Sequence, residues 1–521
     1  MFLKFIKDPL RLMFFWVGLA AVGLYIFYFS VNREFWLDEA FLGINILDRS
    51  YFELWFPLDF KQAAPPLFLM LAKFLYQMPL GLSLEQSLRL YSLLCGIGSV
   101  VLFPLVARNF IKNRLILLMT FILFCFNFRI IYYVQEFKQY GPDVFWGLLL
   151  TFVFLRLKIN KIKNLRLFFY GLLLGCLLFL SYSTVFFMAA GFATLFFDKC
   201  ISFKPLKVNK KYFWKLFRMG VGYFIPFLLF LFMDFLNPYH DFMYAWWVNL
   251  GGFLEKDFSN FFAIFYSFLD YFFWWGIAAN SLLLRIILYV PPFILMLILL
   301  ICPAKYTGKK LAFFSFLLLG ILGASYLNAY PFVDRSLLYF CPLFLIILGA
   351  GADSARKGIR ELSCLFLMFW LLTTGAITAF MTQHYQFVPF HDMRSAVEAL
   401  KKENDSTVTP IYLGYRILFP FIPGVPTHTS AFLFYKKYLN YLPESEILYD
   451  IKIGKSHPSL ECGDYFSPHL VSGKKYVLIW ERGFADTIYG WHKIPRDCFT
   501  QFGMRSHFKK KGSNLYFWIE P

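Results

Sequence analysis

Charged residues are scarce in this 521-residue sequence, at 16% of the chain, whereas hydrophobic residues make up 59% and aromatic residues 22%. A soluble domain carries nearer a quarter charged residues, so this composition argues against a water-soluble globule and excludes a disordered chain. Acids are the scarcer charge, with 32 Asp and Glu against 51 Lys and Arg. Apolar runs of roughly 18 residues or more recur as far as residue 381 and predict a polytopic α-helical membrane protein.

Several motifs of soluble chemistry are also missing from the sequence. It contains no CxxC or HExxH spacing, no P-loop and no GxGxxG, so nucleotide-binding chemistry of the soluble type has no support. Most of the nine cysteines fall inside apolar runs, where a thiol behaves as a small hydrophobe. Cys462 and Cys498 fall in the C-terminal segment and can pair only in an oxidising compartment.

The basic residues gather in short gaps between the apolar runs. Under the positive-inside rule these gaps face the cytoplasm. The formal charge of +19 therefore reports membrane orientation rather than nucleic-acid binding. The basic gaps are residues 108–114, 156–166, 199–218, 305–310 and 356–360, together with the N-terminal cluster 4–11.

Counting crossings between these gaps predicts about eleven transmembrane helices, with the N-terminus cytoplasmic and the C-terminus outside. The stretch 167–198 is too long for one crossing, so we expect a helix pair with residues 181–184 at its outer turn. Successive crossings must run alternately outward and inward. The apolar stretches 65–80 and 262–280 do not fit this alternation and are predicted to be interfacial helices. The expected crossings are 11–30, 86–107, 114–133, 140–157, the pair in 167–198, 218–236, 284–303, 311–329, 336–353 and 361–381.

The composition changes to that of a soluble protein after residue 381. We therefore expect two domains, a transmembrane domain over 1–381 and a small extracytoplasmic α/β domain over 382–521. Within the second, the pattern predicts a helix at 392–403 and strands at 408–413, 476–480 and 515–519.

The first outer loop, residues 31–64, is the only loop with a clear acidic excess. Trp36 suits the headgroup level, which would hold Asp38 and Glu39 at the bilayer edge, and a helix-like run follows at 40–47. One interpretation makes Asp38 the N-cap of that helix, with Glu39 favouring its dipole. The other makes Asp38 a functional carboxylate, and both can hold together.

The second outer loop, Gln135–Tyr140, carries Glu136 and Lys138 at a membrane boundary. These two residues form either a snorkelling ion pair or the polar wall of a binding cleft.

Two further outer loops carry isolated candidates. His240 next to Asp241 is either plain surface or a ligand to metal or substrate. Arg335 lies at the outer end of an expected crossing, although the other basic residues gather mainly in the cytoplasmic gaps. It either pairs with Asp334 or grips a phosphate at the bilayer surface.

These motifs and their order resemble the GT-C superfamily of polyprenyl-phosphate-sugar-dependent glycosyltransferases, which includes protein O-mannosyltransferases and the lipid A aminoarabinose transferase. The likeness covers roughly the first 200 residues well and the rest loosely. Lys138 stands where the family more often has Arg, and no Asp occupies the place of the family's second acid. The matching elements are Leu37-Asp38-Glu39-Ala40, Pro65-Pro66-Leu67, Ser83–Ser92, Gln135–Tyr140 and Pro331–Pro342.

The resemblance implies inverting transfer of a monosaccharide, hexosyl or pentosyl, from a polyprenyl-phosphate carrier to a glycan, lipid or protein acceptor at the outer membrane face. By likeness, Asp38 is the base and Glu39 orients it or the acceptor. The donor phosphate is assigned to Arg335 and Lys138, with Lys61 as a weaker candidate. The expected substrate-binding residues are Glu136, Tyr140, His240 and Tyr330.

The resemblance implies no certain cofactor and leaves a divalent cation open, since some members use one and others do not. The expected partners are the lipid-linked donor, the acceptor and membrane lipids, without nucleic acid, and the expected location is the bacterial inner membrane. Two alternatives stay open: a transporter or flippase for a lipid-linked glycan, and a glycan polymerase or ligase.

Overall fold

The structure is a computed structural model that divides the chain into two compact units. The first comprises Met1–Val31, Ser50–Pro57 and Ala63–Thr382, and the second comprises Asn32–Arg49, Leu58–Gln62 and Gln383–Pro521. The described residues are 8–35, 37–197, 201–203, 206–249, 251–257, 259–273, 282–301, 308–381, 408–413, 448–449, 475–480, 505–511 and 514–520, with Arg394, Glu398 and Tyr438.

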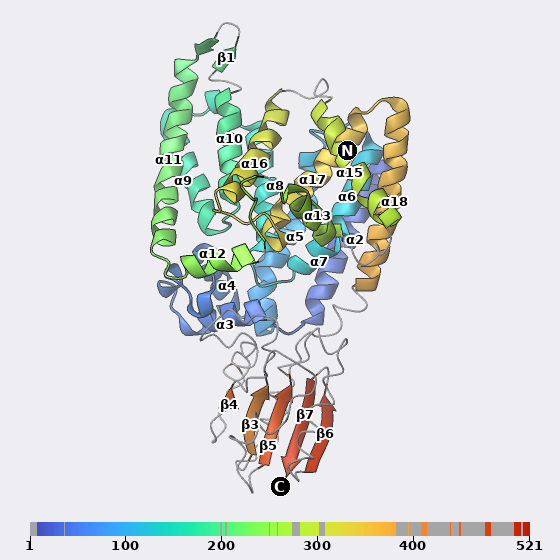
Figure 1. Ribbon diagram of the computed structural model, residues 1–521. Coiled ribbons are helices and arrows are strands. Elements are labelled where there is room, and N and C mark those ends of the chain that lie inside the picture. The colour runs from blue at the N-terminus through green and yellow to red at the C-terminus, as the bar shows by residue number, and fades with distance from the viewer. Residues whose placement is uncertain are drawn as a thin grey trace. The chain divides into compact units, whose positions relative to one another are not determined.

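The first unit is a bundle of helices (Figure 1). Its α-helices are α2 (Pro9–Val31), α4 (Pro66–Gln77), α5 (Leu84–Ala107), α6 (Arg114–Cys125), α7 (Phe128–Tyr133), α8 (Tyr140–Arg156), α9 (Asn164–Cys176), α10 (Thr184–Leu195), α11 (Lys210–Phe235), α12 (His240–Asn249), α13 (Phe261–Phe273), α15 (Leu282–Ile301), α16 (Gly308–Tyr326), α17 (Cys341–Ser354) and α18 (Lys357–Met381). Short 3₁₀ segments are η1 (Glu53–Trp55), η3 (Ile159–Lys161), η4 (Leu177–Phe179) and η7 (Asp334–Phe340), and β1 (Ile201–Phe203) pairs with β2 (Leu206–Val208) as a hairpin that the sequence did not predict.

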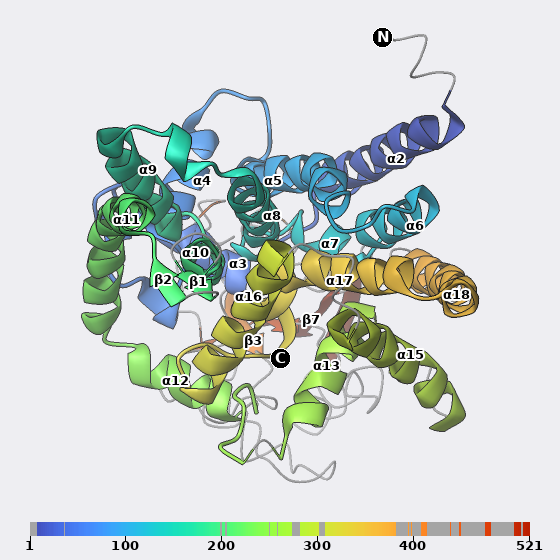
Figure 2. The same ribbon diagram turned by 90° about the horizontal axis from the view of Figure 1, so that it is seen from above.

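Five helical segments of the described residues are long and apolar enough to cross a membrane: α2, α5, α11, Arg335–Ser354 and Lys357–Ala376. Seen along the bundle, α9, α10 and α11 gather at one side, and α2, α6 and α18 at the other (Figure 2). The peripheral helices keep large apolar side chains exposed, such as Trp16 and Phe232. In Arg335–Ser354, by contrast, 94% of the residues in the most apolar stretch of 18 are buried. Apolar side chains exposed in this way need a lipid environment, so the protein is a polytopic helical membrane protein.

The helix boundaries follow the expected crossings closely, with two corrections. The crossing expected at 114–133 is broken into α6 and α7 at Asn127. The Asn127 side chain accepts hydrogen bonds from the backbone N–H of Arg129 (3.0 Å) and Ile130 (3.2 Å) and donates one to the carbonyl of Phe272 (2.8 Å). An asparagine that caps a new helix in this way ends the old one. The crossing expected at 336–353 begins instead as the 3₁₀ segment η7.

The stretch 167–198 is divided as predicted, because α9 and η4 end at Phe179 and α10 begins at Thr184. The two expected interfacial helices correspond to α4 and α13, and residues 274–280 lie outside the described part of the chain.

Glycines allow α9 and α11 to pack backbone against backbone. A Cβ added at Gly171 would lie 1.9 Å from the carbonyl oxygen of Met219, and one at Gly222 would lie 2.1 Å from the carbonyl oxygen of Phe168. Small residues at helix contacts of this kind are the usual basis of close association in membranes, where no hydrophobic force drives helices together.

Gly171→Ala is therefore expected to lower the stability of the protein in detergent by about 1–3 kcal/mol, because the methyl group must push two backbones apart. Gly220→Ala is the matched control, since nothing lies within 4 Å of a Cβ at Gly220 on the same helix pair. Thermal unfolding checks this: a Gly171→Ala melting temperature equal to that of Gly220→Ala would contradict the packing.

The second unit contains α3 (Leu37–Asp48), η2 (Asp59–Lys61) and a five-stranded sheet. Strands β4 (Leu448–Tyr449), β3 (Val408–Leu413) and β5 (Lys475–Trp480) run parallel, and β7 (Asn514–Glu520) and β6 (Arg505–Lys511) continue the sheet antiparallel. The strands expected at 408–413, 476–480 and 515–519 are thus present, whereas β4 and β6 were not predicted. The helix expected at 392–403, apart from helical Arg394 and Glu398, and both Cys462 and Cys498 lie outside the described residues.

Candidate active site

The two first-loop acids occupy the first turn of α3. Because α3 begins at Leu37, Asp38 is a residue of the first turn and not the N-cap, which corrects that interpretation. Both carboxylates favour the positive end of the helix dipole. Glu39 is fully buried and forms an ion pair with Arg33, at 3.6 Å between Nη2 and Oε2, whereas Asp38 is partly exposed. Asp38 is therefore the more accessible acid of the two.

Lys61 ends the 3₁₀ segment η2 in a strained backbone. Phe60 has φ 60° and Lys61 has φ 53°, a left-handed conformation that L residues rarely adopt in succession. Asp59 anchors the segment, since its carboxylate pairs with Arg49 at 3.0 Å and its backbone N–H donates to Asn45 Oδ1 at 2.9 Å. Phe60 stacks on Phe41 of α3, with ring centroids 4.6 Å apart. The strained turn is thus fixed to the helix that carries Asp38.

Gln135–Lys138 forms a buried turn between α7 and α8, whereas Gln139 and Tyr140, where α8 begins, are partly exposed. Glu136 is 1% exposed and Lys138 is 4% exposed, so the expectation that Lys138 snorkels to solvent is wrong. Phe137 stacks on Phe68 of α4 at 5.6 Å between ring centroids, and the Ser92 hydroxyl donates to the Lys138 carbonyl at 3.5 Å. Two ionisable side chains are therefore held in a packed segment against α4 and α5, where burial of a charge is costly unless it is compensated.

Arg335, in η7, lies against this segment. Its guanidinium carbon is 5.4 Å from the centroid of the Tyr140 ring. The Tyr140 ring lies edge-on to Tyr133, with centroids 5.4 Å apart, and Tyr133 is within electrostatic reach of both Arg335 and Glu136. The structure thus brings together three predicted residues, Arg335, Tyr140 and Glu136. The side chain of Asp334 lies outside the described part.

Tyr330 closes the loop before η7. Its hydroxyl donates to the Ser336 carbonyl at 2.9 Å, and the Ser336 hydroxyl donates to the Pro331 carbonyl at 3.0 Å. Burial, with Asp143 and Tyr140 as further causes, raises the pKa of Tyr330 well above its usual value. Tyr330 therefore stays a neutral donor that fixes the loop carrying Arg335.

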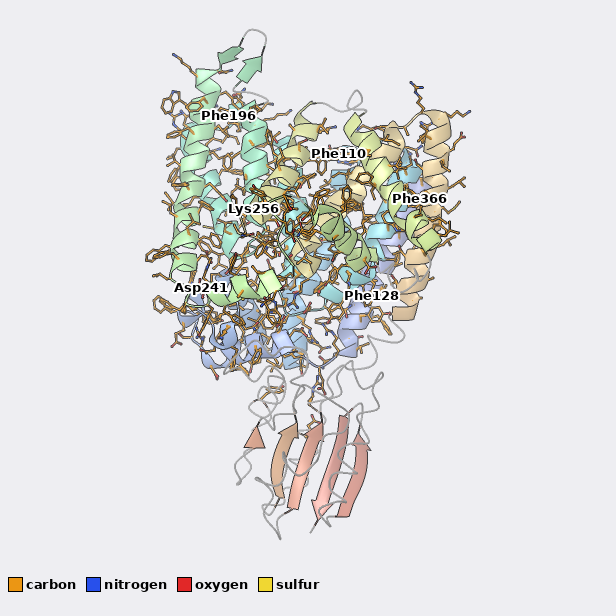
Figure 3. All side chains as sticks on the ribbon, in the orientation of Figure 1. Phe110, Phe128, Phe196, Asp241, Lys256 and Phe366 are labelled. Atoms are coloured by element: carbon orange, nitrogen blue, oxygen red, sulfur yellow. The ribbon has the colours of Figure 1, made fainter. Side chains whose placement is uncertain are left out.

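His240 is not brought to this cluster. It is the first residue of α12, its side chain is 62% exposed, and its Nδ1 is 3.8 Å from a carboxylate oxygen of the fully exposed Asp241. Figure 3 shows Asp241 at the left edge of the helix bundle and Phe128, at the start of α7, toward its right.

A polar network around Asp143 was not predicted from the sequence. Asp143, in the first turn of α8, is 3% exposed and accepts a hydrogen bond from the Ser181 hydroxyl, which lies 3.1 Å from the Ser183 hydroxyl. The Tyr182 hydroxyl donates to the Ala64 carbonyl at 2.9 Å, just before α4. The turn between η4 and α10 thus joins α8 to the segment that opens α4.

Replacing Asp143 by alanine is expected to lower stability by about 2–3 kcal/mol, because the Ser181 and Ser183 hydroxyls lose a buried acceptor. Asp143→Asn retains an acceptor oxygen and is expected to lose less. Asp241→Ala, at an exposed acid, is the control. If Asp143→Ala and Asp241→Ala had the same melting temperature, Asp143 would have no structural role.

Within the described ranges, no three His, Cys, Asp or Glu side chains are grouped as a metal site would require.

No family model matches the sequence, and no curated protein matches it. Among solved structures, the chain is similar to two crystal structures of ArnT from Cupriavidus metallidurans. The ArnT bound to undecaprenyl phosphate is 11% identical with a TM-score of 0.46, and the alignment covers 96% of this chain and 97% of that chain. The apo ArnT is 10% identical with a TM-score of 0.47 and the same coverage.

Proposed function

We propose that the protein is an integral-membrane glycosyltransferase of the GT-C type that moves a monosaccharide from a polyprenyl-phosphate carrier to a glycan, lipid or protein acceptor. The observation that carries the proposal is the contact of Arg335 with Tyr140, beside the buried Glu136 and Lys138, within a bundle of membrane helices. A cation at a membrane boundary needs a reason, and an anionic headgroup supplies one.

The chemistry assigns a role to each group. Asp38 takes the proton of the acceptor hydroxyl as the acceptor oxygen attacks the anomeric carbon. The bond from that carbon to the phosphate oxygen breaks, and its electron pair stays on the phosphate. The carrier phosphate thereby changes from a diester with one negative charge to a monoester with up to two. Arg335 and Lys138 compensate this developing charge.

The remaining predicted residues have supporting roles in this proposal. Glu39, paired with Arg33, orients the first turn of α3 and hence Asp38. Lys61 is an additional cation that binds the donor phosphate. Glu136, Tyr140 and Tyr330 contact the substrates, and His240 is retained only as an acceptor contact because it is exposed on α12.

Incubation of membranes that contain the protein with labelled polyprenyl-phosphate monosaccharide tests the proposal. A transferase moves the label into a new glycan, lipid or protein, whereas a flippase moves the labelled lipid across the bilayer without transfer. A polymerase or ligase ignores the monosaccharide and requires a lipid-linked oligosaccharide. Either of the last two results would reject the proposed function.

A further inference from the structure

Three tyrosine side chains contact one another in series where α7, α8, α13 and η7 meet, and an arginine lies against the first and the last of them. Arg335 lies 5.4 Å from the Tyr140 ring centroid, and the Tyr140 and Tyr133 centroids are 5.4 Å apart. The hydroxyls of Tyr133 and Tyr271 are hydrogen-bonded, and Arg129 lies 4.0 Å from the Tyr271 ring centroid. We name these side chains the Arg–Tyr cluster. It joins Arg129 to Arg335 through a continuous series of contacts.

Arg129 is held in a defined position in this cluster. Its Nε–H donates to the Tyr271 carbonyl at 2.9 Å, and Asn127 fixes the start of α7 to the Phe272 carbonyl of the same helix α13. Tyr133, in the middle, is buried, whereas Arg129, Arg335 and the outer two tyrosines are partly exposed. The two guanidiniums are therefore fixed by packing and remain accessible.

The charge of the cluster favours an anion. Tyr133 is within electrostatic reach of two cations, Arg129 and Arg335, and of one acid, Glu136. Guanidinium groups bind phosphate oxygens in a bidentate manner, and stacking on aromatic rings preorganises them for it. An arginine among membrane helices is costly and usually marks a ligand site.

We propose that Arg129 is a second phosphate-binding residue, which acts with Arg335 on the lipid-linked phosphate. This inference rests on the proposed function and deepens it. The donor is a phosphodiester with one negative charge, which a single guanidinium can balance. Breaking the sugar–phosphate bond leaves up to two charges, so a second guanidinium stabilises the leaving phosphate more than the bound donor.

The test measures binding of undecaprenyl phosphate to the purified full-length protein in detergent, with undecaprenol and inorganic phosphate as separate probes. Arg129→Gln retains a donor for the Tyr271 carbonyl but removes the charge, and Arg129→Lys retains the charge. Arg156→Gln is the matched control, because Arg156 also stacks on a ring, that of Phe152, at 4.1 Å, but in a basic gap. Melting temperatures of all variants are recorded without lipid.

We expect Arg129→Gln to weaken undecaprenyl phosphate binding by at least about tenfold, equivalent to about 1.4 kcal/mol. Arg129→Lys should lose less and Arg156→Gln nothing. Undecaprenol binding should not depend on residue 129, and a loss as large as that for undecaprenyl phosphate would overturn the inference. Inorganic phosphate should compete more weakly in Arg129→Gln than in the wild type, and an equal effect would also count against it.

Equal affinity in Arg129→Gln and wild type would overturn the inference while leaving the proposed function intact. A lower melting temperature with unchanged affinity would show a purely structural role and would also overturn it. Failure of the wild-type protein to bind undecaprenyl phosphate would instead reject the proposed function.

Discussion

Replacing Asp38 by asparagine is expected to lower sugar transfer by about 10²–10⁴-fold, the usual contribution of a general base. Asparagine has nearly the same shape as aspartate but cannot accept the acceptor proton. The change should affect kcat rather than donor binding, because Asp38 acts on the acceptor hydroxyl and not on the phosphate. The measurement is the initial rate of label transfer at saturating donor.

Asp48→Asn is the control for this prediction, since Asp48 is an exposed acid at the other end of the same helix. It should transfer at the wild-type rate. Transfer by Asp38→Asn at the rate of Asp48→Asn would remove Asp38 from the role of base. Glu39 would not then replace it, because its carboxylate is fully buried and paired with Arg33.

Replacing Arg335 by alanine is expected to lower transfer by about 10²–10³-fold, because the developing phosphate charge loses its principal compensation. Arg335→Lys should recover only part of the rate, since an ammonium is a point charge and cannot form the bidentate fork. Unlike the Asp38 variant, the Arg335 variants should also bind the donor more weakly. Steady-state kinetics with varied donor concentration separate the two effects.

Lys256→Ala is the control for Arg335, because Lys256 also lies over a tyrosine ring, that of Tyr326, at 4.4 Å. Its loss should leave transfer unchanged. If Arg335→Ala and Lys256→Ala behaved alike, the contact of Arg335 with Tyr140 would be structural, and the phosphate would have to bind elsewhere.

Features that depend on local sequence could be predicted. Hydropathy and basic gaps gave the helix positions, because a membrane helix needs an apolar run of fixed length. Ser83 and Gln86 form a reciprocal capping box, each side chain accepting from the backbone N–H of the other at 3.2 Å, where the second crossing begins. The break at Asn127 also had a local signal, an Asn within an apolar run, but one polar residue in a long run does not by itself end a helix.

Contacts between distant residues could not be predicted. Asp143 meets Ser181 across 38 positions, and Arg129 meets Tyr271 across 142. Which partners meet is decided by helix packing, and the sequence periodicity of a helix buried on several sides does not report its neighbours. Arg129 is a charge within an expected crossing, so composition alone marked it as unusual, but its place beside Tyr271 needed the structure.

The first-loop acids, Asp38 and Glu39, are proposed to act on the side of the membrane opposite the basic gaps. A membrane-impermeant maleimide applied to intact cells tests it with Asp38→Cys, after subtraction of the labelling of the native cysteines in the wild type. We expect Asp38→Cys to be labelled without permeabilisation, whereas Lys161→Cys, in a basic gap, should be labelled only after permeabilisation. The reverse pattern would place the first-loop acids in the cytoplasm and would contradict transfer at the outer membrane face.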